Sequence, residues 1–202
     1  EARKLAGTTM IYKKAGRNEK KFFLLVAYAA FKRKKKEGGE RMQTVNFNAI
    51  EKLDFRTKES YKTLRTNLEF SGRDRKVISV TSCTPNEGKT SVSFQLALSV
   101  AEGGKRVVLV DADLRKSVLK GRYKTNASRY GLSHYLSGQA SIQDITCRTN
   151  IENFFVIFSG PVPPNPSELL GNDAFRLLLE YLRNEYDYVI VDTPPLGSVI
   201  DG

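Results

Sequence analysis

The amino-acid sequence predicts an α/β fold in which a parallel sheet carries helices on both faces. Four short apolar runs predict strands, and continuous apolar runs are typical of strands buried in a parallel sheet. Helical stretches separate these runs, and strands alternating with helices indicate a doubly wound sheet. The strands are expected at 77–81, 106–111, 154–158 and 188–192.

The segment Thr81-Ser-Cys-Thr-Pro-Asn-Glu-Gly-Lys-Thr90 joins the first expected strand to a helix from about Ser91. Strand, loop and helix in this order predict a phosphate-binding loop, although Cys83 replaces the first Gly of the G-x-x-x-x-G-K-[ST] pattern. We expect Lys89 on the phosphate oxygens, the Thr90 hydroxyl on Mg²⁺ and backbone N–H groups around the β-phosphate. The fold is therefore expected to be of the P-loop NTPase type. The residues expected to contact ATP are Asn86, Glu87, Gly88, Lys89, Thr90 and Ser91.

Three carboxylates follow expected strands: Asp111 and Asp113 follow the second, and Asp192 ends the fourth. Ligands of such sheets bind beyond the carboxyl ends of the strands, so these side chains are expected near the phosphate loop. Carboxylates can hold Mg²⁺ or its waters, and one of them can accept a proton from an attacking hydroxyl. The alternative is that they are turn residues or helix caps.

Three further helices are expected at 58–70, 132–136 and 167–185. In the first, Tyr61, Leu64 and Leu68 share one face by the helical period. Glu59, Lys62 and Arg65 step along a neighbouring, exposed face that suits an interface between protomers. The only histidine, His134, is expected to be structural.

The formal net charge of +11 is concentrated at the N-terminus. Residues 1–41 carry 13 Lys and Arg against 4 Asp and Glu, whereas residues 42–202 carry 20 and 18. The globular part is thus almost neutral, which argues against a nucleic-acid partner. Two cysteines, Cys83 and Cys147, are too few for a disulfide framework or a metal cluster, which fits a reducing compartment.

Residues 1–41 are expected to be an extension separate from the domain that begins at Met42. Its apolar run, 22–31, is about half as long as a membrane-spanning helix. The extension is expected to be disordered or non-native, with an interfacial helix on an anionic membrane as the alternative. Glu37-Gly-Gly precedes Met42, and its codons can spell a ribosome-binding site, so Met42 is a candidate start and residues 1–41 a translated leader.

Together the motifs resemble those of bacterial tyrosine kinases (BY-kinases). The segments starting at Ser82, Val110 and Val189 resemble the Walker A, A′ and B motifs of that family. The segment Glu59-Ser-Tyr-Lys-Thr-Leu-Arg resembles its E-x-x-R-x-x-R oligomerisation helix, with Lys62 where Arg is usual. The resemblance runs from about Met42 to Gly202.

The resemblance implies a cytoplasmic, ATP-dependent tyrosine autokinase of capsular or exopolysaccharide synthesis, at the inner face of the cell membrane. It implies a membrane adaptor of the polysaccharide co-polymerase type as partner, and a homo-oligomeric ring in which neighbouring protomers phosphorylate a C-terminal tyrosine cluster. By the same resemblance, Lys89, Asp111 and Asp113 are catalytic, ATP and Mg²⁺ are the cofactors, and Asp192 supports the metal. The metal set is Thr90, Asp111, Asp113 and Asp192.

The sequence predicts that the sheet is C-terminally incomplete, with further strands expected beside the Asp192 strand. The expected tyrosine cluster is absent too, so the chain alone is expected to be inactive as a kinase and to bind ATP poorly. Two alternatives remain: a partition or cell-division ATPase, and a non-catalytic ATP-gated assembly module of polysaccharide export. Thr84, where partition ATPases carry a second Lys, argues against the first.

Overall fold

In the computed structural model, the described residues are 42–72, 74–126 and 128–198. They form a six-stranded sheet in the order β1-β4-β5-β3-β6-β2. Every neighbouring pair is parallel except β4 and β5, which are antiparallel. The strands are β1 (Thr44–Val45), β2 (Val77–Val80), β3 (Val107–Asp111), β4 (Thr146–Thr149), β5 (Phe154–Ile157) and β6 (Tyr188–Asp192).

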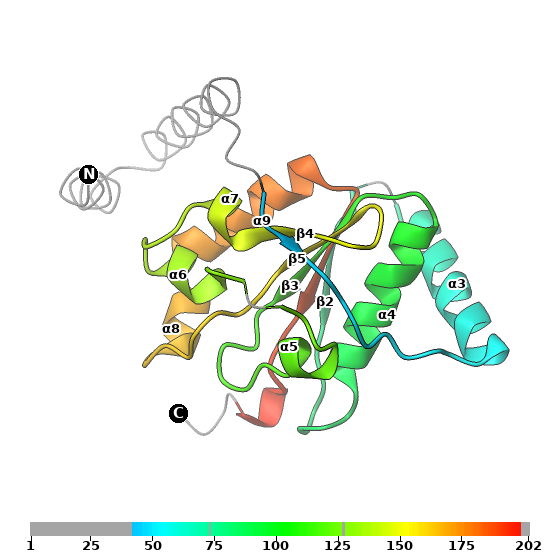
Figure 1. Ribbon diagram of the computed structural model, residues 1–202, viewed down its shortest axis with the longest axis horizontal. Helices are drawn as coiled ribbons and strands as arrows, with labels where there is room; N and C mark the ends of the chain where they lie inside the picture. The colour runs from blue at the N-terminus through cyan, green and yellow to red at the C-terminus, as the bar shows by residue number, and fades with distance from the viewer. Residues whose placement is uncertain (1–41, 73, 127, 199–202) are drawn as a thin grey trace. The chain divides into compact units, whose positions relative to one another are not determined.

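The helices lie on both sides of this sheet. Figure 1 shows α3 (Phe55–Phe70) and α4 (Lys89–Glu102) on one side, with the helices of the second half of the chain largely on the other. This arrangement confirms the predicted fold class. The remaining helices are α5 (Leu119–Arg122), α6 (Leu132–Leu136), α7 (Ile142–Ile145), α8 (Pro166–Leu170), α9 (Asp173–Glu185) and the short 3₁₀ helix η1 (Leu196–Ser198).

The central strands separate two hydrophobic cores, because successive side chains of a strand point to opposite faces. In β3, Val107 and Leu109 pack into the core under α4, whereas Val108 and Val110 pack into the core under α9. All five residues of β3 are buried. Burial on both faces explains why this strand reads as one continuous apolar run in the sequence.

The end of the sheet differs from the expectation in one respect. The sequence predicts an uncovered flank for the Asp192 strand, but β6 pairs with β3 on one side and β2 on the other. The sheet edge on this side is β2, whose residues alternate between exposed and half-buried. The expected exposed flank of β6 is therefore wrong: among the described residues the unpaired edge on this side is β2, and the expectation of an unstable core stays a prediction.

Strands β1 and β4 are not predicted from the sequence. Thr44–Val45 is only two residues long, and β4 contains Cys147 and Arg148 rather than an apolar run. The helix expected at 167–185 is also two helices. Asn172 begins the second helix by accepting a hydrogen bond from the Phe175 N–H, 3.1 Å away.

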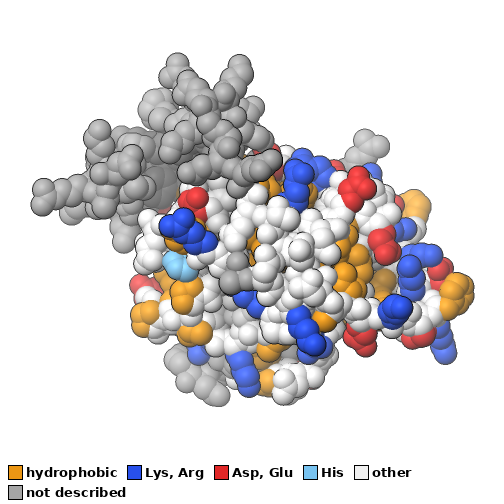
Figure 2. All heavy atoms as spheres, in the orientation of Figure 1, with side chains coloured by type: hydrophobic (Ala, Val, Ile, Leu, Met, Phe, Trp, Pro, Cys, Tyr) orange, Lys and Arg blue, Asp and Glu red, His pale blue; other side chains and the backbone are white. Residues whose placement is uncertain are grey.

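Residues 1–41 lie outside the described residues, and the expectations placed on them stay predictions. Among residues 42–72, 74–126 and 128–198, no helix is both long and apolar enough to cross a membrane. Figure 2 shows Lys and Arg side chains scattered between acidic and neutral ones on the visible face of this part. That face carries no continuous basic surface of the kind that a nucleic-acid backbone requires.

Candidate nucleotide site

The loop before α4 has the backbone geometry of a phosphate cradle. Gly88 precedes the first residue of α4 with φ = 82°, a left-handed conformation in which a side chain would be strained. Asn86 is also left-handed, with φ = 66°. The Glu87 carboxylate accepts hydrogen bonds from the backbone N–H groups of Cys83 (3.0 Å) and Thr84 (3.2 Å), which closes the loop on itself. A hydrogen bond from the Thr84 side chain, together with these two backbone hydrogen bonds, holds the pKa of Glu87 below its ordinary value.

Lys89 forms an ion pair with Asp113, whose carboxylate lies 3.5 Å from Nζ. The two side chains are only 12% and 7% exposed, so the pair is shielded from solvent. The other Asp113 oxygen accepts a hydrogen bond from the Lys116 N–H at 2.9 Å. Asp113 therefore stabilises the turn after β3, as the alternative interpretation predicted, and its role toward a metal stays a prediction.

Asp111 lies in a different environment, although it is only two residues from Asp113. It is 1% exposed, and its carboxylate accepts a hydrogen bond from the Ser117 hydroxyl. Burial raises the pKa of Asp111 to about 7, the Ser117 hydrogen bond opposes the rise, and the nearby Asp192 and Asp113 add to it. At neutral pH this carboxyl group is poised between its protonated and ionised forms.

Asp192 stands beside Asp111 because the two residues are paired across β6 and β3. Its carboxylate accepts a hydrogen bond from the Ser93 hydroxyl at 3.1 Å. Burial raises the pKa of Asp192, and hydrogen bonds from Thr90 and Ser93 oppose that rise. The sheet register thus places the carboxylates of two strands next to the first turn of α4, as the sequence predicted.

A pocket of about 310 Å³ opens beside the loop. Of the expected site residues, Asn86, Gly88, Lys89, Thr90 and Asp113 line it, while Glu87, Ser91, Asp111 and Asp192 do not. Its other lining residues, which sequence reasoning did not assign to the site, are Pro85, Arg115, Lys116, Val118, Arg122, Pro194 and Pro195. Arg115 could have been included from the sequence, because it ends the segment Val110-Asp-Ala-Asp-Leu-Arg115 that resembles the Walker A′ motif. No motif in the sequence indicates Arg122.

Two arginines at this pocket are held by hydroxyl groups. Arg122 donates a hydrogen bond to Ser91 Oγ at 2.8 Å, and Arg115 donates one to Ser167 Oγ at 3.0 Å. With Lys89 and Lys116 they make the pocket strongly cationic, whereas Asp113 is the one carboxylate that lines it. Such a pocket suits a polyanion such as a nucleoside triphosphate.

The residues present fit a magnesium nucleotide. A P-loop Mg²⁺ keeps several waters and takes few protein ligands. In the described part of the chain, Asp111, Asp113 and Asp192 do not form a group of three side chains that could hold a metal without other ligands. Thr90 is 6% exposed at the start of α4, where a single hydroxyl ligand is expected.

His134 accepts a hydrogen bond from the Gly131 N–H through Nδ1 at 3.2 Å, and it does not line the pocket. Cys83 is exposed and Cys147 buried, and both are free thiols. These positions give no chemistry to the site.

On α3, the residues expected at a protomer interface are half-buried rather than fully exposed. Lys62 Nζ lies 2.6 Å from the Glu59 carboxylate one turn away. Arg65 instead reaches α4, where its guanidinium donates a hydrogen bond to the Ser99 carbonyl at 2.6 Å. Arg65 thus has a partner inside its own chain, which the sequence did not predict.

These features define a fold of the P-loop NTPase type: a mostly parallel sheet, a loop of phosphate-cradle geometry leading into α4, and carboxylates at the ends of β3 and β6. Residues 75–201 match the family model described as an AAA domain. The tyrosine-protein kinase CpsD of Streptococcus agalactiae is 45% identical over 146 residues, which cover 72% of this chain and 64% of the relative. CpsD of Streptococcus pneumoniae serotype 4 is 47% identical over 155 residues, covering 76% and 68%.

Among solved structures, the kinase domain of the Escherichia coli tyrosine kinase ETK is similar, with a TM-score of 0.65 and 40% identity. The match covers 68% of this chain and 55% of that one. The chain belongs to the bacterial tyrosine kinase family. It spans slightly less than two thirds of the length of the Streptococcus agalactiae relative.

Proposed function

We propose that this chain carries the ATP- and Mg²⁺-binding core of a protein-tyrosine kinase that regulates capsular or exopolysaccharide synthesis and export. The observation that carries the proposal is the shielded Lys89–Asp113 pair in a cationic pocket at the N-terminus of α4. A phosphate-binding cation and a carboxylate in one pocket are the two groups that phosphoryl transfer requires. Family membership supports tyrosine as the acceptor.

In this proposal ATP takes the place of Asp113 as the ionic partner of Lys89. The phosphates replace Asp113 as the partner of Nζ, and the backbone N–H groups from Asn86 to Ser91 surround the β-phosphate. Mg²⁺, when bound, neutralises part of the phosphate charge, and Thr90, Asp111, Asp113 and Asp192 are the side chains that would serve it. Release of Asp113 from Lys89 frees its carboxylate to accept a hydroxyl proton.

Asp111, which ends β3, and Asp113, which follows it, then have separate roles. Asp113 lines the pocket and can meet an incoming tyrosine hydroxyl, so we assign proton acceptance to it. Asp111 is buried under Ser117 and does not reach the pocket, so its role is toward the metal. A cation nearby lowers the pKa of a carboxyl group, which would ionise Asp111 when the site is loaded.

The proposal extends to assembly and partners. Glu59, Lys62 and Arg65 would contribute to the interface of a homo-oligomeric ring, and a membrane adaptor of the polysaccharide co-polymerase type would hold it at the cytoplasmic face of the membrane. The Glu59-to-Arg65 motif supports the ring. Alanine at Glu59 and Lys62 should lower the mass measured by light scattering, whereas Arg56→Ala on the same helix should not. Equal masses for the two variants would contradict the interface role.

A phosphotyrosine assay tests the function itself. The chain is incubated with ATP, Mg²⁺ and a tyrosine-rich acceptor peptide, with and without an adaptor-tail peptide, and phosphotyrosine is mapped by mass spectrometry. Phosphotyrosine that depends on Lys89 supports the kinase. Nucleotide binding without any phosphotyrosine favours the ATP-gated module or the partition-type ATPase.

A further inference from the structure

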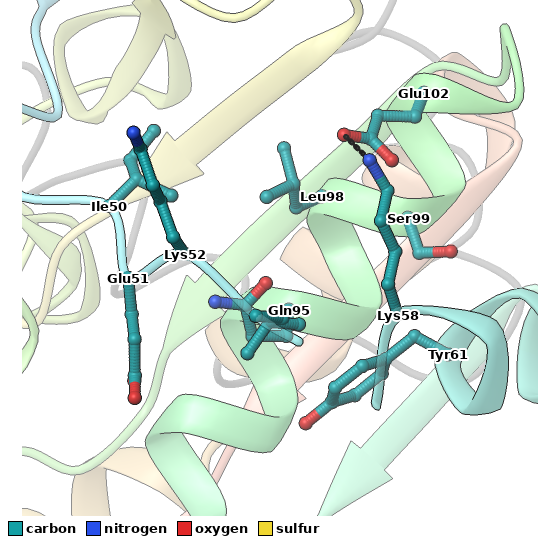
Figure 3. Close-up of a pocket in the computed structure, with 10 residues that line it drawn as sticks. Ile50, Glu51, Lys52, Lys58, Tyr61, Gln95, Leu98, Ser99 and Glu102 are labelled. Atoms are coloured by element: carbon teal, nitrogen blue, oxygen red, sulfur yellow. Dashed lines mark ion pairs between the residues drawn. The ribbon is translucent and has the colours of Figure 1, made fainter. Parts of the chain in front are cut away.

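A second groove, of about 320 Å³, lies between the segment 50–53, α3 and α4. It shares no lining residue with the nucleotide pocket. Figure 3 shows Gln95 and Leu98 of α4 between the segment that carries Ile50 to Lys52 and the helix that carries Lys58 and Tyr61. Neither the phosphate loop nor the carboxylates of the nucleotide site explain this groove.

Two buried polar groups in this groove have no hydrogen-bond partner. They are the Gln95 amide nitrogen and the Ser99 hydroxyl, on residues that are 4% and 5% exposed. An unpartnered buried donor costs about 1–3 kcal/mol, so such groups are rare in native proteins. Of the five such side-chain atoms in the described part of the chain, two line this groove. The groove is therefore built to receive a hydrogen-bonding partner.

The charges around the groove select a neutral ligand. Lys52 and Lys58 are balanced by Glu51 and Glu102, and Lys58 Nζ lies 4.0 Å from the Glu102 carboxylate (Figure 3). A charged ligand would meet both signs at once and gain little net attraction. The charges thus leave selection to the polar and apolar groups of the lining.

The apolar part of the lining comes from three segments of the chain. Ile50 and Leu53 line it from the lead-in segment, Leu98 from α4 and the Tyr61 ring from α3. A side-chain amide carries both donors and an acceptor, the same set as a peptide group. The lining therefore matches a ligand with a secondary amide next to a branched aliphatic group.

We propose that this groove binds an internal, extended segment of a peptide, with one aliphatic side chain between Leu53 and Leu98. The carbonyl oxygen of the peptide group beside that side chain accepts a hydrogen bond from the Gln95 side-chain amide. The volume of about 320 Å³ lies near the lower limit of ligand pockets, which suits one or two residues rather than a folded surface.

The test uses N-acetyl-leucine N-methylamide as the probe of this chemistry. The probe is titrated into the ¹⁵N-labelled chain, and the NMR shifts of the Gln95 side-chain NH₂ group are followed. We expect saturable shifts confined to this groove, and at least tenfold weaker binding by Gln95→Met. Gln139→Met, a change of the same type at an exposed position, should leave the affinity unchanged. N-acetyl-leucine, which carries a free carboxylate, should bind no tighter than the neutral probe.

Methionine has nearly the volume of glutamine, so Gln95→Met should keep the fold. Because it removes an unpartnered buried amide, its melting temperature should equal or exceed that of the parent chain. A marked fall would show that the amide has a partner inside the chain and would overturn the proposal. Absence of saturable shifts in the parent, or equal affinity of Gln95→Met, would overturn it too. If Gln95→Met instead changes the mass seen by light scattering, the occupant is a second copy of this chain and the peptide proposal fails.

Discussion

The N-terminal segment of α4, Lys89–Ser93, and the rest of the helix, Phe94–Glu102, differ in how their polar side chains are satisfied. In the N-terminal segment, Lys89 pairs with Asp113, Ser91 with Arg122 and Ser93 with Asp192. In the rest of the helix, the Gln95 amide nitrogen and the Ser99 hydroxyl are buried and have no hydrogen-bond partner in the described part of the chain. One end of the helix is preorganised as a site, and the other end is incomplete by itself.

The difference reflects how each region is built. The N-terminal segment of α4 faces the carboxyl ends of the central strands, where the strand register brings Asp111 and Asp192 together. The rest of the helix faces α3 and the segment 50–53 with its outer side. The register of paired strands fixes the positions of their side chains, whereas the packing of one helix on another leaves a groove between them. Substitutions in the two parts of α4 should therefore have separable effects.

The largest effect is expected from Lys89→Ala. This change removes the cation that binds the phosphate oxygens and should weaken binding of a fluorescent ATP analogue on the order of 100-fold. Lys105→Ala, past the other end of α4, is the matched control and should bind as the parent does. The melting temperature without nucleotide should fall as well, because Asp113 is left buried without its counterion, so the affinity is measured at a temperature where the variant is folded. Wild-type nucleotide affinity in Lys89→Ala would show that the pocket does not bind phosphates.

Asparagine at positions 111 and 113 should separate the two carboxylates. Asp113→Asn removes the candidate proton acceptor from the pocket and should lower phosphorylation of the acceptor peptide about 10²-fold or more at saturating ATP. Asp111→Asn should act mainly through the metal, so raising the Mg²⁺ concentration should restore part of its activity. Rates measured over a Mg²⁺ series decide the matter. Identical Mg²⁺ dependence in the two variants would refute the division of roles.

The loop and the start of α4 could be predicted from the sequence, because residue types at a fixed spacing indicate them. Gly88, Lys89 and Thr90 are typical of a phosphate-binding loop, and an aspartate after an apolar run indicates the end of a strand. Ser93, Ser117 and Arg122 were not predictable, since their roles depend on which loops the sheet brings together.

The strands at the β1–β4 edge escaped prediction for a related reason. Val45 and Cys147 are buried by tertiary packing, yet neither belongs to an apolar run. The flank of β6 was predicted wrongly because chain order does not give strand order: β2 comes early in the sequence but pairs with the last described strand. The groove beside Gln95 leaves no motif at all. The sequence thus predicts the residues of the nucleotide pocket, which belong to motifs, and does not predict the groove beside Gln95, which arises from packing of the helices.

The stability of the chain should show the titration of Asp111. Its folded pKa of about 7 exceeds the ordinary value of 3.8, so its contribution is fully present below pH 4 and is lost as the pH rises through 7. Each pH unit that separates the folded pKa from the unfolded pKa corresponds to about 1.4 kcal/mol of unfolding free energy, so the loss is expected to reach a few kcal/mol. Asp111→Asn lacks this titration.

Urea unfolding of the parent and of Asp111→Asn is measured without metal and nucleotide. The unfolding free energy of the parent relative to that of the variant should therefore be lower at pH 8 than at pH 5. Groups that do not interact with Asp111 cancel in the difference between the two chains, whereas the coupled titration of Asp192 and Asp113 is part of the measured effect. A difference in unfolding free energy that stays constant from pH 5 to pH 8 would show that Asp111 titrates normally.

The smallest effect is expected from Arg65→Ala, which removes a contact between α3 and the C-terminal part of α4. Its guanidinium donates to the Ser99 carbonyl near the C-terminus of the helix, where a cation also meets the negative end of the helix dipole. Hydrogen bonds to charged groups contribute about 1.5–3 kcal/mol, and the half-buried position places this one toward the lower value. Lys62→Ala is the matched control, because Lys62 pairs only with Glu59 on its own helix, a contact worth about 0.2–0.5 kcal/mol. Urea unfolding at low protein concentration, where protomers are separate, should show the larger loss in Arg65→Ala, with nucleotide affinity unchanged in both. Equal losses would mean that the Arg65 hydrogen bond adds nothing measurable to the contact between α3 and α4, and that Arg65 is available to a neighbouring protomer.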